Sequence, residues 1–133
     1  MEANQSEIVR CGEHSDYGTL TFLFQDSMGG LEVRAVDNSW IKADPRPDTI
    51  LINVGDLLEI FTNGQFPATL HRVVIPHEEV KRRQGRQSIV FFLHPESDTL
   101  VEPLINLEKT NKKYLPITAL DHVNKRFAAT YQY

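Results

Sequence analysis

Cysteine is nearly absent from this sequence: Cys11 is the only one among 133 residues. A single cysteine excludes an internal disulfide framework and indicates a reducing compartment. No apolar run approaches the roughly 18 residues of a membrane-spanning helix, and residues 1–10 lack the apolar centre of a secretory signal. Positive charge is not in excess either, since the net charge is −4. We therefore expect a cytoplasmic protein that binds neither nucleic acid nor a membrane surface.

The composition is that of a globular domain with one buried core. Hydrophobic residues make up 41% of the chain and charged residues 24%. Two-residue alternation of apolar and polar side chains dominates the first two-thirds and predicts β-strands. The expected strands include residues 20–24, 31–35, 50–54, 69–75 and 86–93. The third of these is nearly all apolar, which predicts a strand that is buried on both faces.

The last part of the chain has a different pattern. Thr118, followed three residues later by Asp121, resembles a helix-capping box. Apolar residues then recur at helical spacing, from Leu120 to Phe127. We expect an amphipathic helix over residues 119–129, packed on the outside of the sheet. The predicted fold class is an all-β core, an antiparallel barrel or sandwich of about seven strands, with a C-terminal α-helix.

Three residues are candidate metal ligands: His14, Asp16 and His71. Side chains two apart on a strand project to the same face, so His14 and Asp16 can both point at one ion if this segment is extended. Two imidazoles and one carboxylate suit Fe(II), and three ligands on one face of an octahedron leave three positions for other molecules. His71 comes from a distant predicted strand, which would fix the ion to the sheet.

Arg86 and Ser88 are also two residues apart, at the start of an apolar strand, so their side chains should project to the same face. Val90 and Phe92 continue that face, so a guanidinium and a hydroxyl would share an otherwise apolar cavity. A planar guanidinium beside a hydroxyl is well shaped to bind a carboxylate. The spacing alone does not place this pair near the metal ligands.

These residues lie within a longer ordered set of motifs. The motifs are Gly12-Glu13-His14-Ser15-Asp16-Tyr17-Gly18, Gly30-Leu31-Glu32-Val33, Asn53-Val54-Gly55-Asp56, Thr62-Asn63-Gly64, Leu70-His71-Arg72-Val73 and Arg86-Gln87-Ser88-Ile89-Val90-Phe91-Phe92. With this order, the sequence from about Arg10 to about Pro103 resembles the catalytic half of the iron- and 2-oxoglutarate-dependent dioxygenases, in the branch that includes isopenicillin N synthase. The resemblance implies a double-stranded β-helix, or jelly roll.

The resemblance also implies a reaction and a role for each site residue. His14, Asp16 and His71 would bind Fe(II), and Arg86 and Ser88 would bind the distal carboxylate of 2-oxoglutarate. Dioxygen and a small organic substrate would react there, with hydroxylation of a C–H bond and release of succinate and CO2. The protein would position the substrate and keep the cavity dry, and no catalytic residue is implied beyond the metal site.

The resemblance divides the chain into two parts. Residues 1–105 would form the double-stranded β-helix dioxygenase domain, and residues 106–133 a C-terminal extension that carries the helix. Family members usually have an additional N-terminal half, which supplies much of the substrate pocket, and the resemblance, which starts at about Arg10, leads us to expect that this half is missing here. The spacing from His71 to Arg86 is longer than in the family, and the extra length falls in residues 76–85.

Two alternatives stay open at this point. The chain could be a truncated, non-catalytic metal-binding or interaction module that self-associates through the face left uncovered by the missing N-terminal half. It could also be an iron oxidase that does not use 2-oxoglutarate, in which Arg86 and Ser88 hold a carboxylate of the substrate.

The remaining histidines and Cys11 are expected to be structural. His77 falls in a polar loop with the basic residues 81–83, which we interpret as solvated. His94 precedes a proline and belongs to a turn. We place His122 on the exposed side of the tail helix, and Cys11 in the interior as a small filler, the usual position of a free cysteine.

Overall fold

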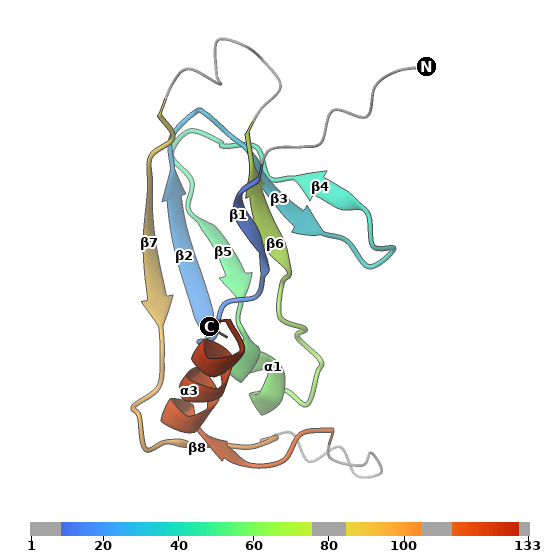
Figure 1. The fold of residues 1–133 in the computed structure, drawn as a ribbon, viewed down its shortest axis with the longest axis vertical. Helices are drawn as coiled ribbons and strands as arrows, with labels where there is room; N and C mark the ends of the chain where they lie inside the picture. The colour runs from blue at the N-terminus through green and yellow to red at the C-terminus, as the bar shows by residue number, and fades with distance from the viewer. Residues whose placement is uncertain (1–8, 76–84, 105–112, 131–133) are drawn as a thin grey trace. The chain divides into compact units, whose positions relative to one another are not determined.

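The computed structural model describes residues 9–75, 85–104 and 113–130 of the chain. The elements of these residues are, in chain order, β1 (Val9–His14), β2 (Leu20–Gln25), β3 (Leu31–Arg34), β4 (Trp40–Lys42), β5 (Leu51–Val54), α1 (Asp56–Phe61), β6 (His71–Val74), β7 (Ser88–Leu93), β8 (Leu100–Val101), β9 (Ile117–Thr118) and α3 (Ala119–Thr130). The mostly-β architecture with a C-terminal helix is therefore confirmed (Figure 1). The described residues contain more strands than the expected seven because β8 and β9 have two residues each, too few for alternation to detect.

The chain forms two compact units, and each draws on segments far apart in the sequence. The first unit is made of Met1–His14, Leu23–Ile50 and Leu70–Ile89. The second unit is made of Ser15–Phe22, Leu51–Thr69 and Val90–Tyr133. No helix among the described residues has the length and apolar character needed to cross a membrane.

A four-stranded sheet with the order β1-β6-β3-β4 forms the centre of the first unit (Figure 1). All three neighbouring pairs run antiparallel. The turn between β3 and β4 contains Asn38 at φ 67°, a left-handed conformation that asparagine tolerates better than most residues. Glu32 of β3 lies opposite Arg72 of β6, and their side chains form an ion pair at 2.7 Å. This pair helps to set the register in which β6 presents His71.

A three-stranded sheet has the order β5-β2-β7. In β2 the buried side chains are Thr21 and Leu23, whereas Phe24 on the other face is 44% exposed. The expectation that the strand at residues 50–54 is buried on both faces is wrong, because Ile50 and Ile52 are 48% and 55% exposed. The apolar composition of β5 was sufficient to predict a strand, but the described part of the chain leaves one of its faces uncovered.

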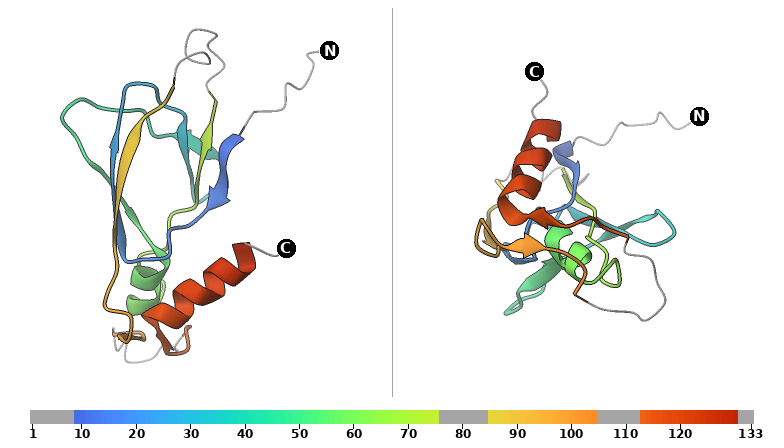
Figure 2. Two further views of the ribbon diagram at one scale, coloured as in Figure 1. Left: turned by 60° about the vertical axis from the view of Figure 1, so that its left-hand side comes forward. Right: turned by 90° about the horizontal axis from the view of Figure 1, so that it is seen from below.

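The core of the second unit lies between α1, the β8-β9 pair and the start of α3. Its buried residues are Leu57, Ile60, Val101 and Ala119, and Phe61, Tyr114 and Ile117 pack against them. Figure 2 shows the beginning of α3 beside α1. Burial of these side chains is the main force that holds the two helices together.

The predicted tail helix is present, and it begins where the capping pattern places it. The backbone N–H of Asp121 donates a hydrogen bond to Thr118 Oγ1 at 3.1 Å. The helix runs from Ala119 to Thr130, one residue beyond the expected end. Its far end contacts Tyr17, whose ring packs edge-on against Phe127 at 5.6 Å between centroids and whose hydroxyl lies 3.0 Å from Thr130 Oγ1.

Candidate metal centre

Two histidines of the first unit lie next to each other on neighbouring strands. His14 ends β1 and is the register partner of His71, which begins β6, with 4.3 Å between ring centroids. The pairing of β1 is irregular at Cys11, where the register shifts. The backbone carbonyl of Gly12 accepts a 2.8 Å hydrogen bond from His14 Nδ1. Because a carbonyl can only accept, Nδ1 carries the proton and Nε2 carries the lone pair that a metal requires.

Asp16 is a buried carboxylate of the second unit, with 6% of its surface exposed. Its Oδ2 accepts hydrogen bonds from Thr21 Oγ1 at 2.6 Å and from Asn53 Nδ2 at 2.8 Å. Thr21 comes from β2, and Asn53 comes from β5. Two donors on one oxygen fix the orientation of the carboxylate, which is the usual support of a metal-binding carboxylate.

His14, Asp16 and His71 together form a group that could hold one metal ion. Each residue offers one ligand atom, and the three atoms lie within 4.8 Å of one another. Only one residue separates Asp16 from His14, so the chain itself keeps these two ligands close. Two imidazoles and one carboxylate are a ligand set that Fe(II) accepts, so the residues present fit the metal. Among the described residues, no other group of three His, Cys, Asp or Glu side chains meets this criterion.

Arg86 and Ser88 lie together in the first unit, as their spacing predicted. The Arg86 Nη1–H donates to Ser88 Oγ at 3.0 Å, and the Nε–H donates to the backbone carbonyl of Gly29 at 3.1 Å. Burial lowers the pKa of Arg86, while the nearby Asp26 carboxylate raises it. An arginine remains charged after such a shift, so the pair presents a fixed cation beside a hydroxyl.

The sheet of the first unit relates this pair to His71. Gly29 precedes Gly30, whose carbonyl accepts a 2.8 Å hydrogen bond from the backbone N–H of Val74. Val74 ends β6 and His71 begins it, which corresponds to about 10 Å along the strand. Arg86 therefore contacts the turn that lies against the end of β6 farther from His71. The spacing of these residues in the sequence does not predict where Arg86 lies relative to His71.

Sequence reasoning missed the residues that hold Asp16 in place. Thr21 lies within the predicted strand over residues 20–24 but was not identified as a site residue, and it is 3% exposed and bonded to Asp16. Asn53 was recognised only as part of a motif. A polar residue between apolar neighbours in a predicted strand is the signal that could have identified Thr21, because a buried hydroxyl requires a partner.

His122 was expected on the exposed side of the tail helix, and this is wrong. Its side chain is 13% exposed, and its Nε2 lies 3.0 Å from Asp56 Oδ2. Burial of the Asp56 carboxyl raises its pKa, but hydrogen bonds from His122 and Ser15 and the charge of Arg126 outweigh this and lower the pKa below its ordinary value. The helical pattern was assigned from apolar residues alone, so it did not reveal a buried face made of ionic side chains.

Cys11 was expected to be a buried filler, and this is also wrong. The side chain is exposed, and its Sγ lies 3.8 Å from His14 Nδ1. The physical reason is that β1 is an edge strand of its sheet, and its residues are exposed from Val9 to Glu13. The expectations for His77 and for the basic residues 81–83 lie outside the described residues.

Comparison with known proteins identifies the family. The family model of the 2OG-Fe(II) oxygenase superfamily matches residues 2–95. The UPF0676 protein C1494.01 of Schizosaccharomyces pombe is 40% identical over 126 residues, which cover 92% of this chain and 38% of that protein. A homoarginine-6-hydroxylase of Glycine max is 43% identical over 97 residues, which cover 72% of this chain and 28% of that protein. The chain thus spans well under half the length of these relatives.

A solved structure shows the same fold. The full-length Neurospora crassa protein in complex with alpha-KG (2-oxoglutarate) and thymine aligns with a TM-score of 0.78 at 38% identity. The alignment covers 92% of this chain and 38% of that protein. This similarity confirms the double-stranded β-helix, or jelly roll, that the motifs implied. By its sequence and its fold, the chain belongs to the 2OG-Fe(II) oxygenase superfamily, whose members use iron and 2-oxoglutarate.

Proposed function

We propose that this chain carries the iron and 2-oxoglutarate sites of an oxygenase that hydroxylates a C–H bond of a small organic substrate. The observation that carries the proposal is the group formed by His14, Asp16 and His71, whose ligand atoms lie within 4.8 Å of one another. The reaction consumes dioxygen and 2-oxoglutarate and releases succinate and CO2 with the hydroxylated product. Bound iron would supply the redox chemistry that couples decarboxylation of 2-oxoglutarate to oxidation of the substrate.

The protein's own contribution is to hold the participants in place. His14 offers Nε2 because its Nδ1 proton is held by the Gly12 carbonyl, and Asp16 is oriented by Thr21 and Asn53. These contacts preorganise the ligands before the metal arrives, so less free energy is spent on ordering them. The carboxylate also offsets part of the charge of the metal.

Arg86 and Ser88 would bind the distal carboxylate of 2-oxoglutarate. The guanidinium is half-buried and already donates to Ser88 Oγ, so both groups converge on the same space. A carboxylate in that space would receive charge-assisted hydrogen bonds, which are roughly twice as strong as neutral ones. The fixed backbone contact of Arg86 with Gly29 limits the entropy lost when the carboxylate binds.

The proposal is tested by anaerobic Fe(II) titration of the chain with and without 2-oxoglutarate, followed by the visible absorption of the metal chelate. An absorption band that saturates with 2-oxoglutarate supports both sites. Iron binding without the band favours the oxidase alternative, in which Arg86 and Ser88 hold a substrate carboxylate. Oxygen uptake that is independent of 2-oxoglutarate would support the same alternative, and a chain that binds neither iron nor 2-oxoglutarate contradicts the proposal.

One observation favours a second candidate function, an interaction module that binds another copy of itself. β7 exposes apolar side chains on both faces, since Ile89 and Phe91 on one face are 66% and 59% exposed and Phe92 on the other is 51% exposed. It also lies at the edge of its sheet. Exposed apolar edge strands favour pairing with another strand. Light scattering on the purified chain tests this, because a monomer at all concentrations excludes it and a concentration-dependent dimer supports it.

A further inference from the structure

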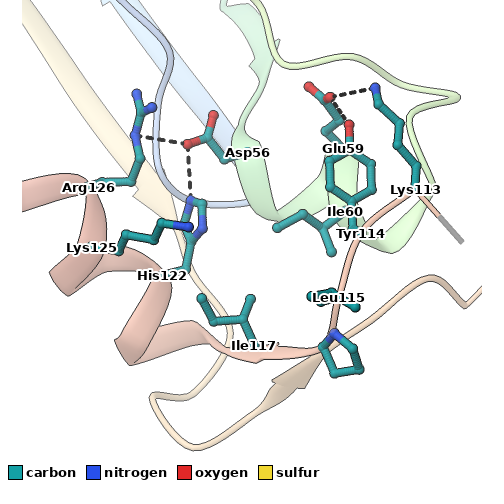
Figure 3. A pocket seen from close by; sticks show the side chains of 11 residues that line it. Asp56, Glu59, Ile60, Lys113, Tyr114, Leu115, Ile117, His122, Lys125 and Arg126 are labelled. Atoms are coloured by element: carbon teal, nitrogen blue, oxygen red, sulfur yellow. Dashed lines mark hydrogen bonds and ion pairs between the residues drawn. The ribbon is translucent and has the colours of Figure 1, made fainter. Parts of the chain in front are cut away.

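The C-terminal helix of the second unit makes charged contacts with the start of α1. His122 and Arg126, one helical turn apart on α3, both approach Asp56 (Figure 3). Asp56 Oδ2 lies 3.0 Å from His122 Nε2 and 3.2 Å from Arg126 Nε. The Arg126 Nε–H does not make a hydrogen bond, so the contact with Arg126 is an ion pair. Two positively charged or donating groups of one helix therefore converge on a single carboxylate oxygen.

Asp56 is also hydrogen-bonded to Ser15 and Asp16, in the turn that carries the candidate ligand Asp16. Its Oδ1 accepts a 2.7 Å hydrogen bond from Ser15 Oγ, and its backbone N–H donates a 2.8 Å bond to the carbonyl of Asp16. Arg126 also reaches the turn directly, because its Nη2–H donates to Ser15 Oγ at 3.2 Å. Ser15 and Asp16 are each 6% exposed. Ser15, which lies between the candidate ligands His14 and Asp16, is thus hydrogen-bonded to the C-terminal helix.

Tyr17, the next residue along the chain, contacts the same helix. Its ring packs against Phe127, the Arg126 guanidinium lies 4.9 Å from the ring centre, and its hydroxyl reaches Thr130. The helix therefore holds Ser15 and Tyr17, on both sides of Asp16, by side-chain contacts. The Asp16 carboxylate is held separately, by Thr21 and Asn53.

We infer that Arg126 and His122 are positioning residues for the metal site. They act through Asp56 and Ser15 and hold the Ser15–Asp16 turn in the conformation that directs the Asp16 carboxylate to the metal. A turn held in this way spends less free energy on ordering when the metal binds, which is the general effect of residues that support metal ligands. The inference rests on the proposed function, since it requires that Asp16 binds the metal.

Anaerobic Fe(II) titration by calorimetry tests the inference on the full chain. We expect Arg126→Met, which keeps an unbranched apolar stem and removes the guanidinium with its charge, to weaken Fe(II) binding about 10-fold. Lys125→Met is the matched control, because it removes a positive charge from the adjacent position of α3. Lys125 makes no ion pair with any described residue, so this variant should stay within about twofold of the unaltered chain.

A double-mutant cycle separates positioning from general loss of stability. If Arg126 acts through Ser15, then Arg126→Met adds little to the effect of Ser15→Ala on the dissociation constant for Fe(II). If the two substitutions weaken Fe(II) binding independently, so that their effects multiply in the double variant, Arg126 does not act through Ser15. Arg126→Lys preserves charge for the ion pair with Asp56 and should recover part of the affinity if Arg126→Met folds poorly.

The outcomes for the metal site and for the helix are distinguishable. If the unaltered chain binds Fe(II) and Arg126→Met binds it equally well, only the positioning role is wrong. If the unaltered chain binds no Fe(II), the proposed function fails and the positioning role fails with it. Both the proposed function and the positioning role are supported if Arg126→Met binds Fe(II) about 10-fold more weakly, Lys125→Met binds it as the unaltered chain does, and the double-mutant cycle is non-additive.

Discussion

His14 is the antiparallel register partner of His71, and the centres of the two rings are 4.3 Å apart. The two residues are the last of β1 and the first of β6, so a single strand pairing brings together ligands that are far apart in the sequence. Register in an antiparallel pair determines which side chains meet, and a shift by one residue would turn one ring to the opposite face of the sheet. The β1-β6 pairing is therefore the structural basis of the candidate metal centre.

Removal of either imidazole should abolish metal binding while the chain stays folded. We expect His71→Ala to weaken Fe(II) binding by more than the roughly 10- to 100-fold that is typical for loss of a supporting contact. His94→Ala is the control, because His94 lies outside the group of candidate ligands. Anaerobic Fe(II) titration measures the affinity, and far-UV circular dichroism verifies the fold. Equal affinity in the two variants would exclude His71 as a ligand.

Thr21 should matter for the metal because it donates a hydrogen bond to the Asp16 carboxylate. Thr21→Val keeps the shape of the side chain and removes the donor. We expect destabilisation of about 1.5–3 kcal/mol, the value of a hydrogen bond to a charged group, and Fe(II) binding that is about 10-fold weaker. Thr19→Val, which removes a bond to the neutral carbonyl of Leu93, should leave the metal affinity unchanged. Urea unfolding and Fe(II) titration of both variants provide the comparison.

Substitution of Arg86 should affect 2-oxoglutarate and leave iron unaffected. Arg86→Lys retains the charge but loses the planar guanidinium that contacts both Ser88 and Gly29. We expect the affinity for 2-oxoglutarate to fall by at least about 10-fold, the effect of one lost charge-assisted hydrogen bond. The control is Arg46→Lys, at an exposed position of the same unit. A parallel loss of iron affinity in Arg86→Lys would show that Arg86 has a structural role instead.

Gly55 should not tolerate a side chain. A Cβ at this position would lie 2.4 Å from the carbonyl oxygen of Gly18 and 2.9 Å from that of Asp16. Both atoms belong to the backbone, so they cannot move aside cheaply, and we expect Gly55→Ala to destabilise the chain by about 1–3 kcal/mol. Gly12→Ala, where no atom would lie within 4 Å of the added Cβ, should change stability little. Thermal unfolding of the two variants measures the difference, and equal melting temperatures would contradict the crowding at Gly55.

Acid should weaken the second unit through Asp56. The pKa of this carboxyl is lowered in the folded chain, since the bonds from His122 and Ser15 and the charge of Arg126 outweigh the effect of burial. A lowered pKa contributes stability that is fully present above the unfolded pKa of about 3.9 and is lost as the pH falls through the folded pKa. Asp56→Asn should therefore lose less stability between about pH 5 and pH 2 than the unaltered chain.

Urea unfolding midpoints measured across this pH range test the role of Asp56. The control is Asp98→Asn, at an exposed carboxyl of the same unit, which should retain the acid sensitivity of the unaltered chain. If Asp56→Asn is as sensitive to acid as the unaltered chain, the ionic contacts of Asp56 with α3 contribute nothing to stability.

Features that depend on neighbouring residues could be predicted from the amino-acid sequence alone. Alternation placed β2, β3, β6 and β7 to within a few residues, and Thr118 marked the start of α3, because both patterns report the geometry within one element. The motifs predicted the family, and they also identified His14, Asp16 and His71 as candidate metal ligands. The spacing of Arg86 and Ser88 likewise predicted that they would lie together.

Which elements contact one another became known from the three-dimensional structure. It placed His14 opposite His71, paired Thr21 with Asp16, and directed His122 and Arg126 to Asp56 instead of to solvent. It also exposed Cys11 and one face of β5. The physical reason is that strand register and helix packing depend on the burial and charge of many side chains from distant segments, and no pattern within a single segment contains that information.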